Sequence, residues 1–159
     1  MRFRHEMAYD AGADRVYAMK ADRRFREEVC RHQQVLRYRV DLEDTASGLS
    51  VDIDQVQALR GVATSVRRFV GEEIEIEQRE TWHSPGDATL VVSIPGKPGR
   101  MDGRISLREQ DGRTVETVTG DIRVKVPLVG RQIEEMVARV FRYALDAEYA
   151  VGTDWLEDD

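Results

Sequence analysis

The strand-like stretch EEIEIEQRETW carries polar side chains on a face that is otherwise apolar. Because successive residues of a strand point to opposite faces, Gln78 and Glu80 share a face with Ile74, Ile76 and Trp82. Burying a carboxylate is costly unless it is paired or hydrogen-bonded. Glu80 therefore needs a partner, a water molecule or a ligand.

Three interpretations of these polar side chains stay open. In the first, Glu80 lies near the rim of a sheet, where it is solvated or paired with an arginine. In the second, Gln78, Glu80 and His5, which alternation places inward with Phe3 and Met7, mark the polar end of an apolar ligand site. In the third, Glu80 has a raised pKa and acts with His5 as general acid and base in a cyclase or dehydratase reaction.

Two further positions bear on such a site. The aromatic side chains of Tyr38 and Trp82 are expected either to line a cavity or to belong to the ordinary core. On the last predicted strand Glu116 has the parity of Ile122, so it is also predicted to point inward. A β-bulge at Gly120 would reverse that assignment.

The common catalytic and metal-binding motifs are absent from the sequence. It has no glycine-rich phosphate loop, no G-x-S-x-G, no His-x-x-x-His and no pair of cysteines. His5, His32 and His83 lie on different predicted elements, so we expect no metal site, no cofactor and no assigned catalytic residue. The single cysteine, Cys30, is expected to be a small buried hydrophobic residue rather than a reactive thiol.

The composition predicts one acidic domain that covers residues 1–159. The 24 basic and 30 acidic residues give a net charge of −6, which argues against general nucleic-acid binding. Four early arginines are interleaved with acidic residues and are interpreted as a solvated helix face: Arg23, Arg24, Arg26 and Arg31. One cysteine fits a reducing compartment, and no segment approaches the ~20 apolar residues of a membrane span. We expect a cytoplasmic protein without stable membrane insertion.

The elements that must position these residues follow from hydrophobic periodicity. Alternating patterns predict strands over 2–9, 36–43, 49–56, 72–82, 88–94, 100–110 and 114–126. Two short helices are predicted within 12–33, the second capped by Asp22. Asp111-Gly112 is a hairpin signal, whereas residues 60–71 fit a short helix or a loop. Strands joined by hairpins with helices apart from them indicate an antiparallel sheet in an α+β fold.

A long amphipathic helix is predicted from about Gly130 to about Leu156. Its apolar residues recur every three or four positions and share one face: Val129, Ile133, Met136, Val137, Val140, Ala144, Ala147, Val151 and Trp155. We expect this face to cover the concave side of the curved sheet, with Val140 at the centre of the contact. Because two such surfaces do not touch everywhere, an internal space is expected between them.

The same helix carries a second apolar series on its flank: Ala138, Phe141, Leu145, Tyr149 and Leu156. Such a stripe has two explanations. The helix lies deep in the sheet and its flank meets the segment from Val62 to Val70, or Phe141, Leu145 and Tyr149 form a homodimer contact about a two-fold axis.

Three stretches carry a resemblance to a known group: GADRVYAM, GEEIEIEQRETW, and VKVPLVGRQIEEMV with the later DWL. With the order of elements, they resemble an uncharacterised bacterial family of the helix-grip superfamily, which includes START lipid-transfer domains, the birch-pollen allergen group and polyketide cyclases (SRPBCC). The resemblance implies a curved sheet of about seven strands around a C-terminal helix, with a cavity and usually a hydrophobic or amphipathic ligand. Some members are protein-binding modules, and no catalytic residue carries over.

The expected function is non-enzymatic binding of a lipid, isoprenoid or polyketide-like molecule in that cavity. Residues of the strands and the long helix are the candidate ligand contacts: His5, Tyr38, Ile76, Gln78, Glu80, Trp82, Ile133, Met136, Val137, Val140 and Ala144. Two alternatives stay open, a cyclase or dehydratase-type enzyme that uses Glu80 and His5, and an interaction module whose cavity is filled by its own side chains.

Overall fold

The computed structural model describes residues 1–158 of the chain. Seven strands form one antiparallel sheet in the order β1-β7-β6-β5-β4-β3-β2. The strands are β1 (Arg2–Tyr9), β2 (Arg37–Thr45), β3 (Gly48–Ala58), β4 (Glu73–Ser84), β5 (Asp87–Ser93), β6 (Gly99–Gln110) and β7 (Arg113–Val124). The helices are α1 (Ala13–Lys20), α2 (Arg23–His32), α3 (Thr64–Val70) and α4 (Gly130–Glu157).

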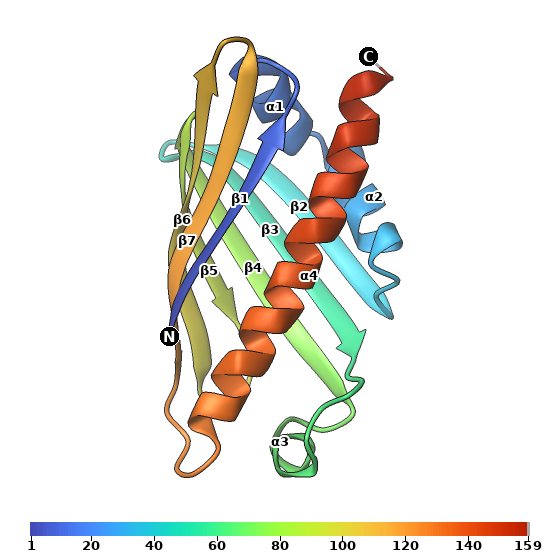
Figure 1. Cartoon of the computed structure of the whole chain (residues 1–159), viewed down its shortest axis with the longest axis vertical. Helices are drawn as coiled ribbons and strands as arrows, with labels where there is room; N and C mark the ends of the chain where they lie inside the picture. The colour runs from blue at the N-terminus through green and yellow to red at the C-terminus, as the bar shows by residue number, and fades with distance from the viewer. Residues whose placement is uncertain (159) are drawn as a thin grey trace.

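The sheet curves around α4, which crosses its concave face from one end to the other (Figure 1). The 28 residues of α4 span about 42 Å at 1.5 Å per residue. Helices α1 and α2 lie beside the C-terminal half of α4, and α3 lies at the opposite end (Figure 1). This is the α+β helix-grip arrangement predicted from the sequence. Within residues 1–158, no helix is both long enough and apolar enough to cross a membrane.

The local signals for helix and turn formation are confirmed. Asp22 caps α2, because its side chain accepts a hydrogen bond from the backbone N–H of Arg24 at 2.8 Å. Asp111 and Gly112 both have positive φ, 56° and 77°, as a tight two-residue hairpin turn between β6 and β7 requires. The ambiguous segment 60–71 contains α3, a short helix of seven residues.

Strand β7 has no β-bulge at Gly120, so the reversed assignment of Glu116 is wrong. The pairing of β7 with both neighbours runs through Gly120 without a shift, and Gly120 stands opposite Gly103 of β6. A Cβ atom on Gly103 would lie 2.3 Å from the carbonyl oxygen of Thr119. The two glycines therefore allow a close backbone approach, and the inward parity of Glu116 is confirmed. A shift in strand register occurs instead between Trp82 and Ser84.

The residues of α4 that were expected to face the sheet divide into two groups. Four are buried as predicted: Ile133, Met136, Ala147 and Val151. Val129 and Trp155, at the two ends of the predicted series, are half-buried. Between them along the helix, Val137, Val140 and Ala144 are only half-buried, so Val140 is not the centre of the helix–sheet contact. The physical reason is that all three side chains border a cavity rather than packed strands.

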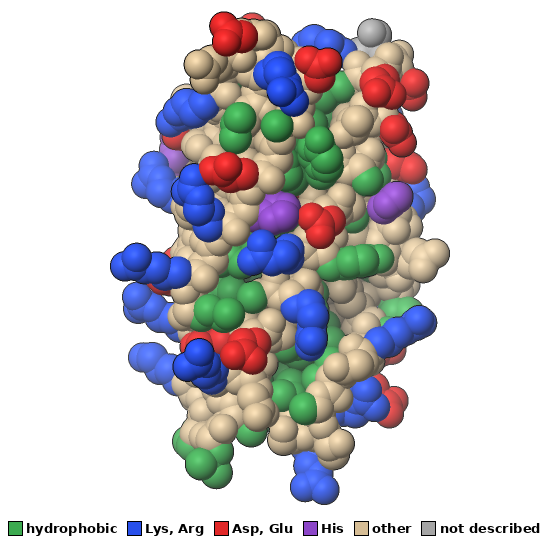
Figure 2. All heavy atoms as spheres, in the orientation of Figure 1, with side chains coloured by type: hydrophobic (Ala, Val, Ile, Leu, Met, Phe, Trp, Pro, Cys, Tyr) green, Lys and Arg blue, Asp and Glu red, His purple; other side chains and the backbone are tan. Residues whose placement is uncertain are grey.

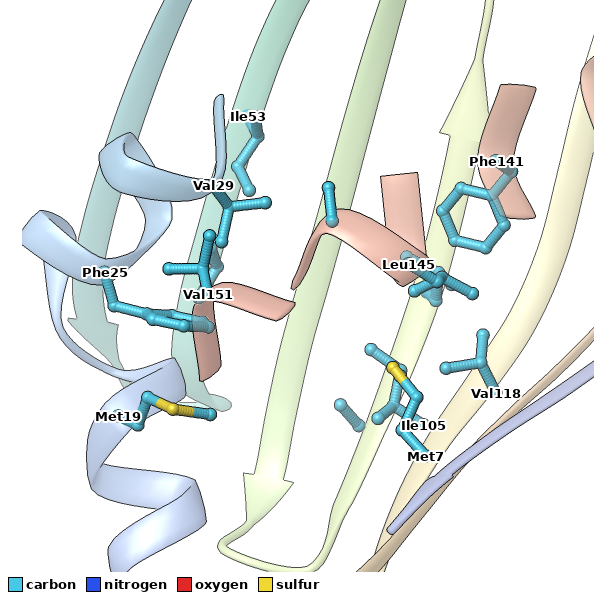
Figure 3. Packing of buried hydrophobic residues seen from close by; sticks show 14 of the residues in the cluster. Met7, Met19, Phe25, Val29, Ile53, Ile105, Val118, Phe141, Leu145 and Val151 are labelled. Carbon is cyan, nitrogen blue, oxygen red and sulfur yellow. The ribbon is translucent and has the colours of Figure 1, made fainter. Parts of the chain in front are cut away.

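The flank of α4 belongs to the core. Phe141 and Leu145 are buried and point from α4 toward the sheet (Figure 3). The ring of Phe141 packs on Phe3 of β1 with 5.2 Å between centroids, and Tyr149 packs on Tyr9 at 5.4 Å. The flank therefore meets β1 rather than residues 62–70.

The alternative explanation, a homodimer contact, does not fit the burial of Phe141 and Leu145, which are already enclosed within one chain, whereas Tyr149 is 40% exposed. Helix α3 packs against the beginning of α4 instead. Their side chains form a second apolar cluster with the adjoining strand ends: Leu59, Val66, Val70, Ile74, Ile94, Val124, Ile133 and Met136.

Replacing Phe141 with Ala should lower the free energy of unfolding by about 3–5 kcal/mol, because it removes a ring that packs on β1 and leaves a cavity. Tyr143→Ala, two residues away at a side chain that is 57% exposed, should change it by no more than about 0.5 kcal/mol. Urea unfolding measures both. Equal effects of the two substitutions would contradict the assignment of the buried flank.

Candidate ligand-binding site

A buried ion pair joins α2 to the inner face of the sheet. The guanidinium of Arg26 donates two hydrogen bonds to Glu80 of β4, at 2.9 and 2.8 Å, in a bidentate arrangement. The side chains are 2% and 1% exposed. Gln78 and Trp82 donate to the two oxygens of Glu80 at 2.7 and 2.8 Å. Glu80 is therefore a fully hydrogen-bonded carboxylate.

A second group of charges adjoins this pair. The Nζ of Lys20, at the end of α1, donates to Glu116 of β7 at 2.5 Å and also to Glu148 of α4. The Nε of Arg26 donates to the backbone carbonyl of Lys20 at 2.7 Å, which links the two groups. The Oε2 atom of Glu116 has no hydrogen-bond partner among the described residues, although Glu116 is 0% exposed. We call Lys20, Arg26, Glu80, Glu116 and Glu148 the charged cluster.

The two sheet carboxylates of the cluster have opposite pKa shifts. Burial by itself raises the pKa of Glu80, but the charges of Arg26 and Lys20 outweigh burial and lower it to about 2. Burial raises the pKa of Glu116 to about 7, and the negative charge of Glu148 adds to the increase that Lys20 opposes. Glu80 is thus ionised at neutral pH, whereas Glu116 is near its titration midpoint.

A small inner cavity of about 40 Å³ lies between the sheet and α4, beside the charged cluster. Its walls are mainly aliphatic side chains from β3, β4, β5 and α4. The polar members of its lining are Arg26, Cys30, Gln33, Gln55, Gln57, Gln78 and Glu148. Three of the glutamines are hydrogen-bonded in series, since Gln57 donates to Gln33 at 3.3 Å and to Gln55 at 2.9 Å.

An outer cavity of about 360 Å³ adjoins the inner one near the ends of β3 and α2. Gln33, Gln57 and Val140 line both cavities, so the two spaces lie next to each other. The rest of its lining comes from the ends of α2 and β3, the loop before α3 and the middle of α4: Gln34, Leu36, Ala58, Leu59, Arg60, Val62, Met136, Arg139 and Tyr143.

The structure brings several of the candidate ligand contacts together. Five border the inner cavity: Ile76, Gln78, Val137, Val140 and Ala144. Met136 borders the outer cavity, while Ile133 is buried in the second apolar cluster. Glu80 and Trp82 lie behind the cavity wall, where the indole N–H of Trp82 donates to Glu80.

His5 and Tyr38 lie away from both cavities. His5 contacts Asp146 on the outer side of α4, with 3.3 Å between Nε2 and Oδ1. Tyr38 is exposed on the edge strand β2 and accepts a hydrogen bond from Arg31. Three strands separate His5 on β1 from Glu80 on β4. The hypothesis of a Glu80–His5 acid–base pair with a raised Glu80 pKa is therefore wrong.

Sequence reasoning missed the basic side of the charged cluster. The solvated-face interpretation holds for Arg23, Arg24 and Arg31 but is wrong for Arg26, which is buried. A signal was present, since Arg26 occupies the same stripe of α2 as the buried residues Phe25, Val29 and Cys30. Lys20 and Glu148 were missed for the same reason, as charged residues on otherwise apolar helix faces. Burial raises the pKa of the Cys30 thiol to about 11.

Solved structures from several bacteria have the same fold. The protein TTHA0849 from Thermus thermophilus has a TM-score of 0.65 and 16% identity over 97% of this chain and 95% of that one. A START superfamily protein from Mycobacterium smegmatis has a TM-score of 0.61 and 12% identity over 98% of each chain. The di-domain ARO/CYC StfQ from the steffimycin biosynthetic pathway has a TM-score of 0.62 and 11% identity over 99% of this chain and 51% of that one.

Sequence comparison adds one finding. The family model described as "Protein of unknown function (DUF2505)" matches residues 4–156. No curated protein matches the chain. At 11–16% identity, the structural likeness establishes the fold alone.

Replacing Glu80 with Gln should lower the free energy of unfolding by about 3–5 kcal/mol, because the buried guanidinium of Arg26 loses its counter-ion. Glu77→Gln is the matched control on the outer face of the same strand, where Glu77 lies 3.7 Å from the half-exposed Arg79. It should cost no more than about 1 kcal/mol. Denaturant unfolding of both variants checks this. A Glu80→Gln protein as stable as the control would exclude a structural role for the pair.

The raised pKa of Glu116 predicts that the free energy of unfolding decreases as the pH rises. Between the ordinary pKa of 4.5 and about 7, the unfolded chain releases a proton that the folded chain keeps. Raising the pH through this window should therefore cost up to about 1.4 kcal/mol per pH unit, with a plateau above it. Glu80 acts oppositely, and only below pH 4.5.

Glu116→Gln should remove this component, and unfolding from pH 5 to 8 measures the slope. Glu43→Gln, at an exposed position on β2, should keep the parent slope. Identical slopes in the parent and in Glu116→Gln would show that Glu116 is ionised throughout the range.

Proposed function

The chain belongs to the family described as Protein of unknown function (DUF2505), and from the geometry of its two cavities we propose that it binds a small apolar or amphipathic molecule between the sheet and α4. The observation that carries the proposal is that an inner cavity with aliphatic walls and a polar end lies beside a larger cavity and shares Gln33, Gln57 and Val140 with it. Ligand sites in proteins have this composition, mostly apolar with a few placed polar groups.

The sizes of the two cavities favour a ligand that occupies both. The inner cavity of about 40 Å³ has room for roughly three water molecules. The outer cavity, at about 360 Å³, lies within the roughly 300–1,000 Å³ of small-molecule sites. We infer that the ligand lies mainly in the outer cavity and extends one end past Val140 toward the charged cluster.

The polar end of the inner cavity offers hydrogen-bond acceptors. Gln78 donates its amide N–H to Glu80, so its amide oxygen remains available to a ligand at the cavity wall. Glu148 accepts from Lys20 through Oε1, and its second oxygen has no hydrogen-bond partner among the described residues. The two terminal nitrogens of the Arg26 guanidinium already donate hydrogen bonds to Glu80. The end of the ligand that reaches this point is therefore apolar or carries a donor such as a hydroxyl group.

Two structural neighbours support the proposal by their descriptions. One is a START superfamily protein, and another is an ARO/CYC protein of the steffimycin biosynthetic pathway. The same fold therefore serves in the biosynthesis of a small organic molecule. In this chain the predicted acid–base pair, Glu80 and His5, lies on strands that are far apart in the sheet. This separation favours binding over the cyclase alternative.

Replacing Ala144 with Phe should fill the inner cavity and weaken binding of the neutral fluorescent probe N-phenyl-1-naphthylamine by about tenfold or more. Ala150→Phe, at an exposed position of the same helix, is the matched control and should bind like the parent. Fluorescence titration measures affinity, and thermal unfolding verifies that both variants are folded. A parent protein that does not bind the probe would instead favour an interaction module with a closed interior.

A further inference from the structure

Two cations at the outer cavity have no anionic partner. Arg60, from the loop after β3, and Arg139, from α4, both line this cavity. Within residues 1–158 neither has a hydrogen bond or an ion pair, in contrast to Arg79, Arg100 and Arg108, each of which contacts a carboxylate. The cavity lining contains no acidic residue.

This surplus of positive charge is local. The chain as a whole has a net charge of −6, yet residues 60–71 contain three arginines and no acidic residue. Acidic side chains gather instead toward the other end of the molecule, near the C-terminus of α4 (Figure 2). Lys and Arg side chains, with apolar side chains between them, prevail in the lower half of the same face (Figure 2).

The mouth of the outer cavity is also apolar. Leu36 and Tyr143 line it and are 48% and 57% exposed. Leu59, Val62 and Met136 extend this apolar lining toward Val140, which lines both cavities. A ligand that covers this surface gains from burial of apolar area, while its charged end stays beside the two arginines.

We infer that the ligand is an amphipathic anion, an aliphatic chain with a carboxylate head group held by Arg60 and Arg139. This inference rests on the proposed binding function and adds the chemical class and the orientation. Guanidinium groups match carboxylates in geometry and charge. The opposite orientation is disfavoured, because the carboxylate would meet Glu148 at the inner end, where the guanidinium of Arg26 is already occupied by Glu80.

Three probes of equal chain length test this inference: decanoate, 1-decanol and decylammonium, each below its micelle concentration at pH 7.5 and low salt. In calorimetric titrations the parent protein should bind decanoate about tenfold more tightly than decanol, and decylammonium most weakly. Addition of 0.5 M NaCl should reduce the preference for decanoate, since exposed charges are screened by salt.

The double variant Arg60→Gln/Arg139→Gln should bind decanoate and decanol with equal affinity, and its affinity for decanol should match that of the parent. Arg104→Gln, at an exposed position on β6 outside both cavities, is the control and should keep the preference. Thermal unfolding checks that the variants are folded.

The outcomes separate this inference from the proposed function. Equal binding of decanoate and decanol by the parent would overturn the anionic head group and leave ligand binding intact. A preference for decanoate that persists in the double variant would overturn the assignment to Arg60 and Arg139. Binding of none of the three probes by the parent would overturn the proposed function itself.

Discussion

The buried ion pair between Arg26 and Glu80 is the constraint on which the rest of the interior depends. Removing one partner would leave an uncompensated charge in the interior, so α2 must dock with Arg26 directly against β4. Arg26 also holds the end of α1 through the carbonyl of Lys20, whose ammonium reaches Glu116 of β7 and Glu148 of α4. One charged cluster thereby joins three helices and two strands.

This cluster also determines where the cavity can lie. Charged and aromatic side chains fill the concave face beside α1 and α2, and the apolar cluster around α3 fills the opposite end. Between them, the stretch of α4 that carries Val137, Val140 and Ala144 is only half-buried. A straight helix cannot follow a curved sheet along its whole length, and the space that results is the inner cavity, with the outer cavity at Arg60 and Arg139 beside it.

The inward parity of strand residues was predictable, because it depends only on local alternation. Gln78, Glu80 and Glu116 all point inward as predicted, and Gln78 lines the cavity. Parity gives no position along the strand and no distance to other elements. His5 has inward parity, but its side chain contacts Asp146 on the outer side of α4. Tyr38 is exposed because β2 is an edge strand.

The sequence by itself determined the order of the elements, the hairpin turns and the helix-grip fold, because hydrophobic period, caps and turn residues act over a few neighbouring positions. Only the tertiary structure decided which face of α4 is buried most deeply. The apolar arc of that helix is wider than the surface that a sheet can cover, so contacts with β1 favoured Phe141 and Leu145 over Val140. The tertiary structure also decided that Arg26 is buried while its neighbours are solvated. A charge on an apolar stripe becomes buried only when a distant residue, here Glu80 more than fifty positions later, supplies the opposite charge and the hydrogen bonds.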